Sequence, residues 1–266
     1  MTAACPIGFD IGRLRRQVRA TYERVARAPE GEFHFRRGLE YAVTELRYDR
    51  AELLALPAAC TARFAGIGNP LRVGPIAPGE TVLDHACGAG MDLLLAARRA
   101  GPAGRAIGVD MTPDMCDCAT SAAREAGLAG IVDVRHGFFE ELPVEDESVD
   151  CVISNGVLNL APDKLRVLGE IRRVLRPGGR LHLADVMLER ELAPEVRADP
   201  DLWAACVGGA LTETGLIELA ARAGLARGRI VERFDCFRTT RIELKFARAL
   251  RIYGASFCAV KDVRPA

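Results

Sequence analysis

The feature that most constrains the fold is a glycine-containing turn between a short apolar segment and an apolar helical pattern. Residues 82–84 (VLD) predict a buried strand that ends on an acid, and the apolar positions over 91–100 predict a helix. The turn between them, residues 87–90, reads CGAG. Glycines at a strand-to-helix turn allow another group to approach the backbone closely. We therefore expect a ligand against this turn.

Strands and helices alternate beyond this point, which is the pattern of parallel strands joined by crossover helices. Further helices are expected over 113–126 and 162–176, the second closed by RPGG. The expected strands occupy residues 82–84, 106–110, 131–135, 151–154, 181–185, 230–237 and 256–260. The sequence therefore predicts a doubly wound, mostly parallel α/β sheet of seven strands, with the last two strands as a terminal antiparallel pair.

The first 64 residues have a different pattern. Apolar residues recur at helical spacing over 11–25 and again over 39–46. Residues 48–57 predict a third short helix with Asp49 as its N-cap. We therefore expect an N-terminal helical cap or lid over residues 1–64 and a ligand-binding domain over 65–266. Within that domain, residues 187–227 read as an interrupted helical insertion at the carboxyl edge of the sheet, where it would form a substrate wall.

Composition excludes several classes of protein. The 36 Lys plus Arg balance 36 Asp plus Glu, so no net charge attracts nucleic acid or an anionic membrane. No apolar run approaches the roughly 18 residues needed to cross a bilayer, and no signal-peptide pattern is present, so a cytoplasmic protein is expected. The nine cysteines lack zinc-ligand spacing, so we expect reduced thiols and no metal site. The oligomeric state stays open.

The spacing of the glycines argues against a nicotinamide dinucleotide. That pattern needs three glycines as G-x-G-x-x-G, and here Ala86 and Met91 occupy two of the three positions. The glycines fall instead at 88 and 90, after Asp84. A carboxylate at this place suits a ligand that carries an ammonium group.

The next two strands end in further groups that suit a nucleoside. Asp110 ends the second strand, about 20 residues beyond the turn, where an acid holds ribose hydroxyls. Met111 follows directly and can lie against an adenine face. The third strand leads to Phe138 and Phe139 at the same edge. Each of these three apolar side chains also suits a core, and it is their order along the chain that favours a ligand site.

These features together resemble the class I S-adenosylmethionine-dependent methyltransferases over residues 78–190. The resemblance rests on D-x-x-x-G-x-G (84–90), GVDM (108–111), EELPVEDESVDCVISN (140–155) and LRVLGEIRRVLRPGGRLHLADV (165–186). It implies S-adenosylmethionine as cofactor, a Rossmann-like fold and these cofactor-binding residues: Asp84, Gly88, Gly90, Asp110, Met111, Phe138, Phe139, Glu140 and Asn155. Two positions depart from the family pattern. Ala86 replaces a usual glycine, and Phe138 replaces a frequent acid, so adenine is expected to depend more on stacking.

A narrower resemblance, to the arsenite methyltransferases, covers most of the chain. It rests on GIGNP (66–70), SNGVLNLAPDK (154–164), DPDLWAACVGGALTE (199–213) and YGASFCAVK (253–261). In that family cysteine thiolates hold As(III), and the arsenic lone pair attacks the methyl group. Cys206 retains one of these cysteines, whereas Gly156 replaces another. A single thiolate leaves trivalent arsenic labile. Cys236 and Cys258 could face each other across the terminal hairpin, but that place is away from the methyl donor in the expected layout.

The sequence thus predicts an enzyme that methylates a small molecule, either a metalloid or an organic metabolite. Positioning and desolvation suffice for such an in-line displacement, so a base is optional. The candidate catalytic residues are Cys206 and Asp185, and Tyr22 and Tyr41 are expected beside the substrate under the lid. His182 is expected to be a core residue. The alternative from another class is a protein that binds S-adenosylmethionine without transferring its methyl group.

Overall fold

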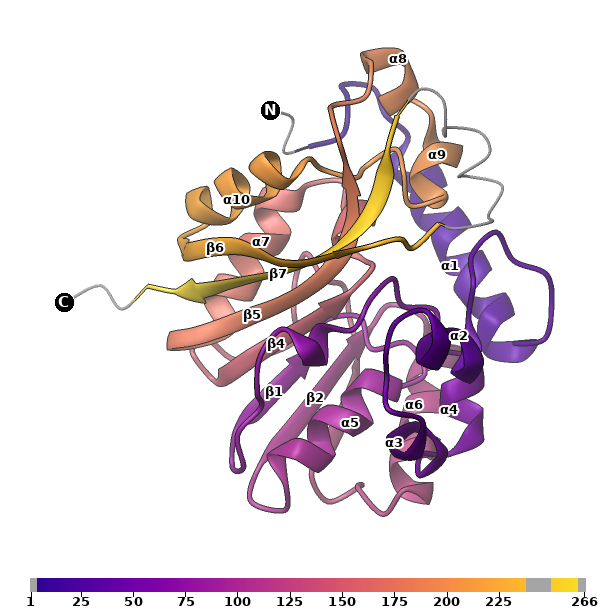
Figure 1. Cartoon of the computed structure of the whole chain (residues 1–266), viewed down its shortest axis with the longest axis vertical. Coiled ribbons are helices and arrows are strands. Elements are labelled where there is room, and N and C mark those ends of the chain that lie inside the picture. Colours follow the sequence, from indigo (N-terminus) through magenta and orange to yellow (C-terminus); the bar gives the residue numbers. More distant parts are fainter. Residues whose placement is uncertain (1–3, 238–249, 263–266) are drawn as a thin grey trace.

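One seven-stranded sheet forms the centre of the chain, in the order β3-β2-β1-β4-β5-β7-β6 (Figure 1). The structure is a computed structural model that describes residues 4–237 and 250–262. The strands are β1 (Thr81–Asp84), β2 (Arg105–Asp110), β3 (Val132–His136), β4 (Val149–Asn155), β5 (Leu175–Leu188), β6 (Leu225–Phe234) and β7 (Ile252–Lys261). The first five strands pair in parallel, and β7 runs antiparallel to both β5 and β6. The predicted doubly wound sheet with a terminal antiparallel pair is confirmed.

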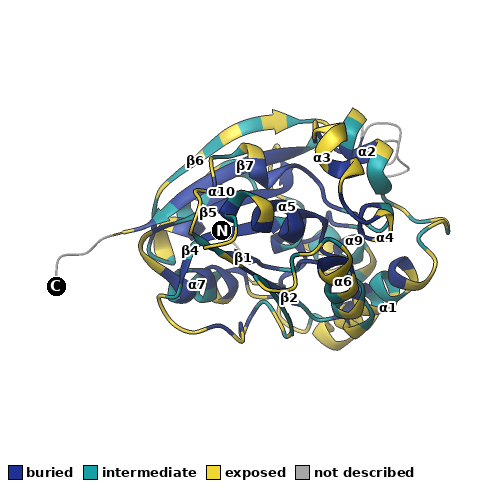
Figure 2. Cartoon of the chain, turned by 90° about the horizontal axis from the view of Figure 1, so that it is seen from below, coloured by how far each residue is buried: buried dark blue, intermediate teal, exposed yellow. Residues whose placement is uncertain are grey.

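Helices cover both faces of this sheet. Four crossover helices are α5 (Met91–Ala100), α6 (Pro113–Glu125), α7 (Lys164–Val174) and α10 (Glu213–Arg222). Apolar residues of α5 and α6 join one set of core clusters, and those of α7 and α10 join another. The sheet is buried between these two layers, while the outer edge strand β6 alternates between half-buried and exposed positions after Leu225 (Figure 2).

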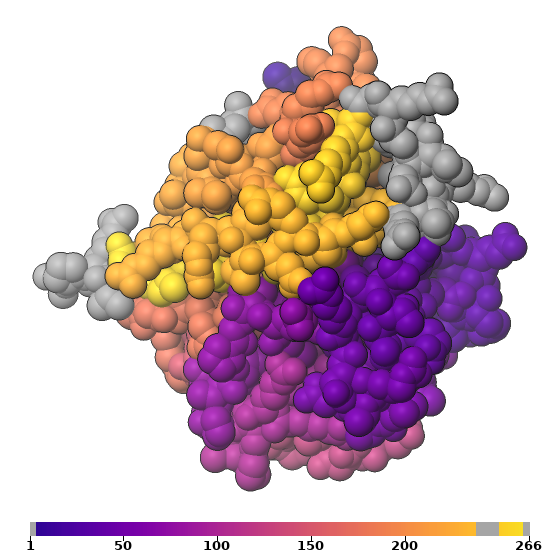
Figure 3. All heavy atoms as spheres, in the orientation of Figure 1, coloured from indigo at the N-terminus to yellow at the C-terminus, as the bar shows by residue number. Residues whose placement is uncertain are grey.

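The N-terminal segment is helical, as predicted. It contains α1 (Ile11–Arg27), α2 (Gly38–Thr44), α3 (Arg50–Leu54) and α4 (Ala58–Ala62), the last of which the sequence pattern did not indicate. Asp49 caps α3, because its carboxylate accepts a hydrogen bond of 2.9 Å from the Glu52 amide. In the space-filling view the indigo N-terminal segment adjoins the orange and yellow C-terminal strands (Figure 3). Segments from both ends of the chain therefore meet on this face.

The range predicted as a helical insertion, 187–227, has a mixed structure. It begins with the end of β5 and then contains α8 (Pro194–Arg197) and α9 (Pro200–Ala204), of which α9 contacts α1. Its last helix, α10, packs against α7 and β6 as a regular crossover helix. Strand β6 begins at Leu225, five residues before the predicted strand, because only one face of this edge strand is apolar.

Cys236 does not face Cys258 across the terminal hairpin. β7 places Cys258 opposite Arg229, whose guanidinium lies 2.6 Å from the Cys258 sulfur. β6 ends at Phe234, so Cys236 lies beyond the pairing and belongs to another cluster. Within the described ranges, no helix has the length and apolar character that a membrane span requires.

Candidate active site

The turn after β1 is built around two glycines with left-handed backbone. Gly88 has φ of +51° and Gly90 has φ of +93°, and Gly90 is the N-cap of α5. A Cβ on Gly90 would lie 3.1 Å from the Cβ of Ala119 on α6, so a side chain there is disfavoured by both conformation and space. Nothing lies within 4 Å of the position that a Gly88 Cβ would take. The turn therefore presents open space beside bare backbone.

The acid at the end of β2 fixes this turn. Asp110 Oδ2 accepts a hydrogen bond of 2.9 Å from the Gly88 amide, and Asp110 Oδ1 accepts one of 2.8 Å from the Thr112 amide. Both bonds stabilise the ionised carboxylate, while burial opposes them and raises the pKa of Asp110 overall. The sequence placed Asp110 at this edge but did not indicate that it would hold the glycine turn.

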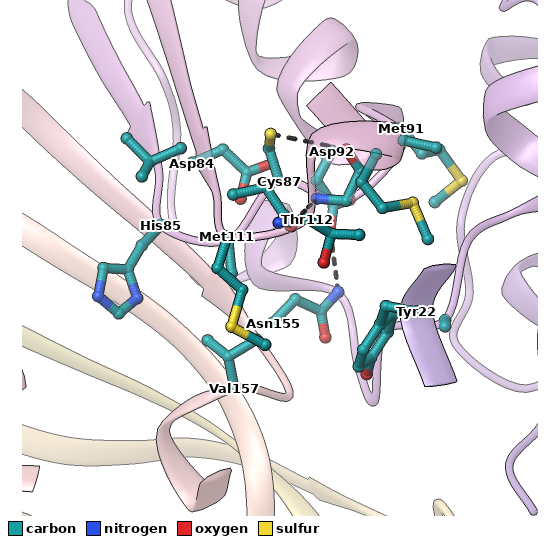
Figure 4. Close-up of a pocket in the computed structure, with 18 of the residues that line it drawn as sticks. Tyr22, Asp84, His85, Cys87, Met91, Asp92, Met111, Thr112, Asn155 and Val157 are labelled. Carbon is teal, nitrogen blue, oxygen red and sulfur yellow. Dashed lines mark hydrogen bonds between the residues drawn. The ribbon is translucent and has the colours of Figure 1, made fainter. Parts of the chain in front are cut away.

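A pocket lies at the carboxyl ends of β1, β2 and β4, where open α/β sheets bind ligands (Figure 4). The space free of protein atoms there is about 880 Å³, which includes the solvent at its open mouth. Of the predicted cofactor-binding and substrate-side residues, the following line it: Tyr22, Asp84, Gly88, Asp110, Met111, Phe139 and Asn155. In Figure 4, Tyr22 lies on the opposite side of the view from His85, with Met111, Val157 and Asn155 between them.

Carboxylates dominate the electrostatics of this pocket. Asp84, Asp92 and Asp110 all line it, and the buried Asp84 Oδ2 has no hydrogen-bond partner in the described part of the chain. Burial and the two neighbouring carboxylates hold the pKa of Asp84 well above its usual value. Arg63 also lines the pocket, but its guanidinium donates to the carbonyl oxygens of Ala26 and Ala59. The pocket is therefore suited to a cationic ligand.

A buried polar network holds one wall of the pocket. Asp92, in the first turn of α5, accepts hydrogen bonds from the Tyr48 hydroxyl (2.7 Å) and from Asn155 Nδ2 (2.9 Å). Asn155 Oδ1 also accepts from the amides of Ile67 and Gly68. Burial raises the pKa of Asp92 to about 6. Sequence reasoning missed Tyr48 and Asp92, because neither belongs to a motif.

Of the three predicted residues in the segment after β3, one lines the pocket and two contact α1. Phe139 lines the pocket and its ring lies 5.8 Å from that of His85. Phe138 is 44% exposed and does not line the pocket, and Glu140 is paired with Arg15 of α1 at 2.9 Å. The cofactor-binding roles of Phe138 and Glu140 stay predictions, and the structure places both at the contact with α1.

His85 is a neutral group at the edge of the pocket. Its Nδ1 lies 3.3 Å from the Ser154 hydroxyl, and its buried Nε2 has no partner within the described ranges. Burial lowers the pKa of His85 to about 4. His182 lies farther along the sheet, 3.7 Å from the Cys151 sulfur, and burial lowers its pKa to about 4 as well. The structure buries His182 in the core, as the sequence predicted.

The remaining predicted substrate-side and catalytic residues, which are Tyr41, Cys206 and Asp185, do not line the pocket. Cys206 is buried, and its apolar cluster contains Cys236 and packs against Tyr22. Tyr41 belongs to a different buried cluster, so its predicted place beside the substrate stays a prediction. Asp185 does not line the pocket, because its carboxylate accepts hydrogen bonds from Asn159 Nδ2 (2.7 Å) and from two backbone amides. Its predicted role as a base stays a prediction.

A buried lysine adjoins this cluster. Lys164 Nζ donates to the Ala161 carbonyl at 2.9 Å and lies 4.4 Å from the centre of a Trp203 ring. Burial lowers the pKa of Lys164 to about 7, although the nearby Asp185 acts in the other direction. The motif SNGVLNLAPDK contains this residue, but no local pattern indicates that its charge is buried.

Comparison with known proteins decides the family. Residues 76–228 match a family described as a methyltransferase domain. The chain belongs to this methyltransferase domain family. The predicted Rossmann-like class I fold is thereby confirmed, and S-adenosylmethionine is the cofactor of this domain.

Several relatives of this methyltransferase domain are arsenite methyltransferases. It is 49% identical to that of Halobacterium salinarum over 162 residues and 37% identical to that of Homo sapiens over 158 residues. These matches cover 60% and 56% of this chain but only 40% and 42% of the relatives, so the chain spans less than half of their length. The solved structure of CrArsM, an arsenic(III) S-adenosylmethionine methyltransferase from Chlamydomonas reinhardtii, matches with a TM-score of 0.73 and 35% identity. That match covers 82% of this chain and 74% of CrArsM.

Proposed function

We propose that this methyltransferase domain transfers the methyl group of S-adenosylmethionine to a small acceptor beside Tyr22, and that trivalent arsenic is the acceptor. The observation that carries the methyl-transfer proposal is the pocket with a bare glycine turn and the unpartnered Asp84 Oδ2. Its residues fit the cofactor. Asp84 would hold the ammonium, the Gly88 turn would face the amino-acid part, and Asp110 would hold the ribose.

S-Adenosylmethionine supplies a methyl group on a cationic sulfonium. The carboxyl groups of Asp84, Asp92 and Asp110 lie together in the pocket, and a cation bound there would favour their ionised forms. The pocket therefore favours that cation over neutral ligands. Met111 and Phe139 would flank the adenine ring. The proposal that residues 1–64 form a lid is supported by Tyr22 of α1, which lines the same pocket.

The acid–base properties of the pocket favour an acceptor that brings its own lone pair. Among the described residues that line it, His85 is a neutral buried imidazole with pKa of about 4, and burial raises the pKa of Tyr22 far above neutral pH. Asp92 is already bound to Tyr48 and Asn155. Arsenic(III) needs no base, because its lone pair attacks directly, whereas a phenol or alcohol must lose a proton. The two arsenite methyltransferase relatives and CrArsM support the same acceptor.

One observation favours an organic acceptor as the second candidate. Gly156 has φ of +73°, and a Cβ there would lie 2.6 Å from Cγ1 of Ile67. The place of the family's cysteine is therefore filled by an apolar side chain, which would suit an organic methyl acceptor.

The test is methyl transfer from labelled S-adenosylmethionine, with arsenite, small thiols and phenols assayed separately. We expect labelled methylarsenicals from arsenite and background labelling of phenols. Asp84→Asn should lower S-adenosylhomocysteine affinity at least tenfold by calorimetry, whereas Asp133→Asn, on the distant β3, should not change it. Labelling of an organic acceptor with arsenite inert would overturn the arsenic assignment. Wild-type protein that binds the cofactor but labels nothing would support the non-catalytic alternative.

A further inference from the structure

We propose that Cys206 and Cys236 together form a two-thiol site that holds a trivalent arsenic centre beside the acceptor end of the pocket. This inference rests on the proposed function and names the ligands of its acceptor. Neither family resemblance nor sequence spacing pairs these two residues, which lie 30 positions apart.

The fold brings the two cysteines into one buried cluster. Cys206 follows α9, and Cys236 follows the end of β6, so they arrive from different elements. Each is only 7% exposed, and both belong to the same buried apolar cluster. Tyr22 packs against this cluster and also lines the cofactor pocket. The cluster that holds the two thiols therefore adjoins the pocket at Tyr22.

The backbone at Cys206 is held in a conformation that favours glycine. Cys206 has φ of +63°, and the Val207 and Gly208 amides both bond to the Leu202 carbonyl, as at the end of a helix closed by a left-handed residue. A non-glycine residue here costs roughly 1 kcal/mol. The cost is consistent with a side chain that is needed at this place, since strained residues cluster at functional sites.

The Cys236 thiol would take the place of the family's cysteine that Gly156 replaces. Ile67 occupies the space where a side chain on Gly156 would lie, so no thiol can enter from β4 without displacing it. Cys5, which is partly buried, also packs against this cluster, whereas three other cysteines have partners elsewhere. The Cys87 thiol contacts the Gly88 carbonyl, the Cys60 thiol donates to the Pro57 carbonyl, and Cys258 contacts Arg229.

Two protonated thiols suit arsenous acid. Burial raises the pKa of Cys206 to about 12 and holds that of Cys236 well above its usual value, so both sulfurs keep their protons at neutral pH. When As(OH)₃ binds, two As–S bonds form, two As–O bonds break, and the two thiol protons leave with two hydroxides as water. Arsenic stays trivalent and keeps one hydroxide and its lone pair. Two soft sulfur ligands then hold it more firmly than one.

The test is titration of the whole chain with phenylarsine oxide, followed by intact mass and by the fluorescence of Trp203. Trp203 is the single tryptophan and lies in the same cluster as both cysteines, so it should report binding there. We expect one tight adduct that survives excess glutathione and is released by dithiothreitol. Cys206→Ser and Cys236→Ser should each weaken binding by about 100-fold or more. The matched controls Cys60→Ser and Cys258→Ser should bind like wild type.

Cys236→Ser or Cys236→Ala that binds phenylarsine oxide like wild type would overturn the proposal. Loss of the adduct in a control but not in Cys236→Ser would do the same. S-Adenosylhomocysteine binding, measured by calorimetry on each variant, shows that the variant is folded. It also separates the two proposals, because a wild-type chain that fails to bind S-adenosylhomocysteine contradicts the proposed function whatever the arsenical does.

Discussion

At the scale of single residues, buried charges have the clearest consequences. The Lys164 side chain is fully buried, and its ammonium contacts a carbonyl oxygen and an aromatic ring. Burial of a cation costs free energy that these contacts only partly offset. The residue therefore makes the stability of the chain depend on pH in a predictable direction.

Burial lowers the pKa of Lys164 from 10.5 to about 7, so the unfolded chain holds one more proton than the folded chain between these two values. Its contribution to the free energy of unfolding therefore rises as pH rises from about 7 towards 10.5. Lys164→Met should remove this rise and should be at least as stable as wild type at pH 7. Urea unfolding of both proteins at pH 7, 8 and 9 checks it. Parallel pH profiles for the two proteins would contradict the prediction.

Gly156 combines a left-handed backbone with a crowded neighbour. Gly156→Ala should lower the free energy of unfolding by about 2–4 kcal/mol, since the Cβ would meet Ile67 and the backbone is unfavourable for alanine. Gly127→Ala is the matched control, because Gly127 has φ of +71° and nothing within 4 Å. It should lose only about 1 kcal/mol. In an Ile67→Ala background, Gly156→Ala should lower the free energy of unfolding by an amount closer to that of Gly127→Ala. Equal losses for Gly156→Ala and Gly127→Ala in the wild-type background would exclude the steric explanation.

At the scale of elements, α1 is held against the rest of the chain by ion pairs at the surface. Arg15 pairs with Glu140, whose side chain is only 9% exposed, and Arg27 pairs with Asp114 of α6. Removing Arg15 leaves a mostly buried carboxylate unpaired, which costs more than the loss of an exposed pair. The position of α1 therefore depends on Arg15 more than on its other arginines.

Arg15→Met should accelerate amide hydrogen exchange across α1 by about tenfold, with smaller effects in the sheet. Arg19→Met is the control, because Arg19 only pairs with Glu23 on the same helix. S-Adenosylhomocysteine should protect α1 in wild type, since Tyr22 lines the pocket. Equal exchange in the two variants would show that Arg15 does not hold the helix.

The sequence patterns predicted helices and strands more accurately than they predicted contacts between distant residues. The glycine turn, α5 and the parallel strands follow from local residue types, which repeat with helix or strand periods. The first five residues of the edge strand β6 and the shared cluster of Cys206 and Cys236 depend on long-range packing that no local pattern encodes. Likewise, the sequence marked Gly156 as a missing cysteine, but only the fold shows that Ile67 fills the space.

At the scale of the whole molecule, charge is balanced overall but unevenly placed. The chain carries 36 basic and 36 acidic side chains, so no net charge draws a cation from a distance. The pocket nevertheless gathers three carboxylates, with its one lining arginine turned to carbonyl oxygens. Selectivity for a cationic ligand must therefore come from short-range electrostatics inside the pocket, which salt screens weakly.

This placement of carboxylates predicts how the affinity of the pocket differs between cofactor and product. S-Adenosylmethionine carries a sulfonium charge that S-adenosylhomocysteine lacks, so the carboxylates should favour the former. Burial raises the pKa of Asp92 to about 6, so Asp92 loses its charge as pH falls through 6. The ratio of the two dissociation constants should therefore shift towards the product by a few-fold to about tenfold between pH 7.5 and 5.5. Calorimetry with both ligands across this range measures it. Asp92→Asn should flatten the dependence, and a constant ratio in wild type would show that the pocket carboxylates do not discriminate the sulfonium.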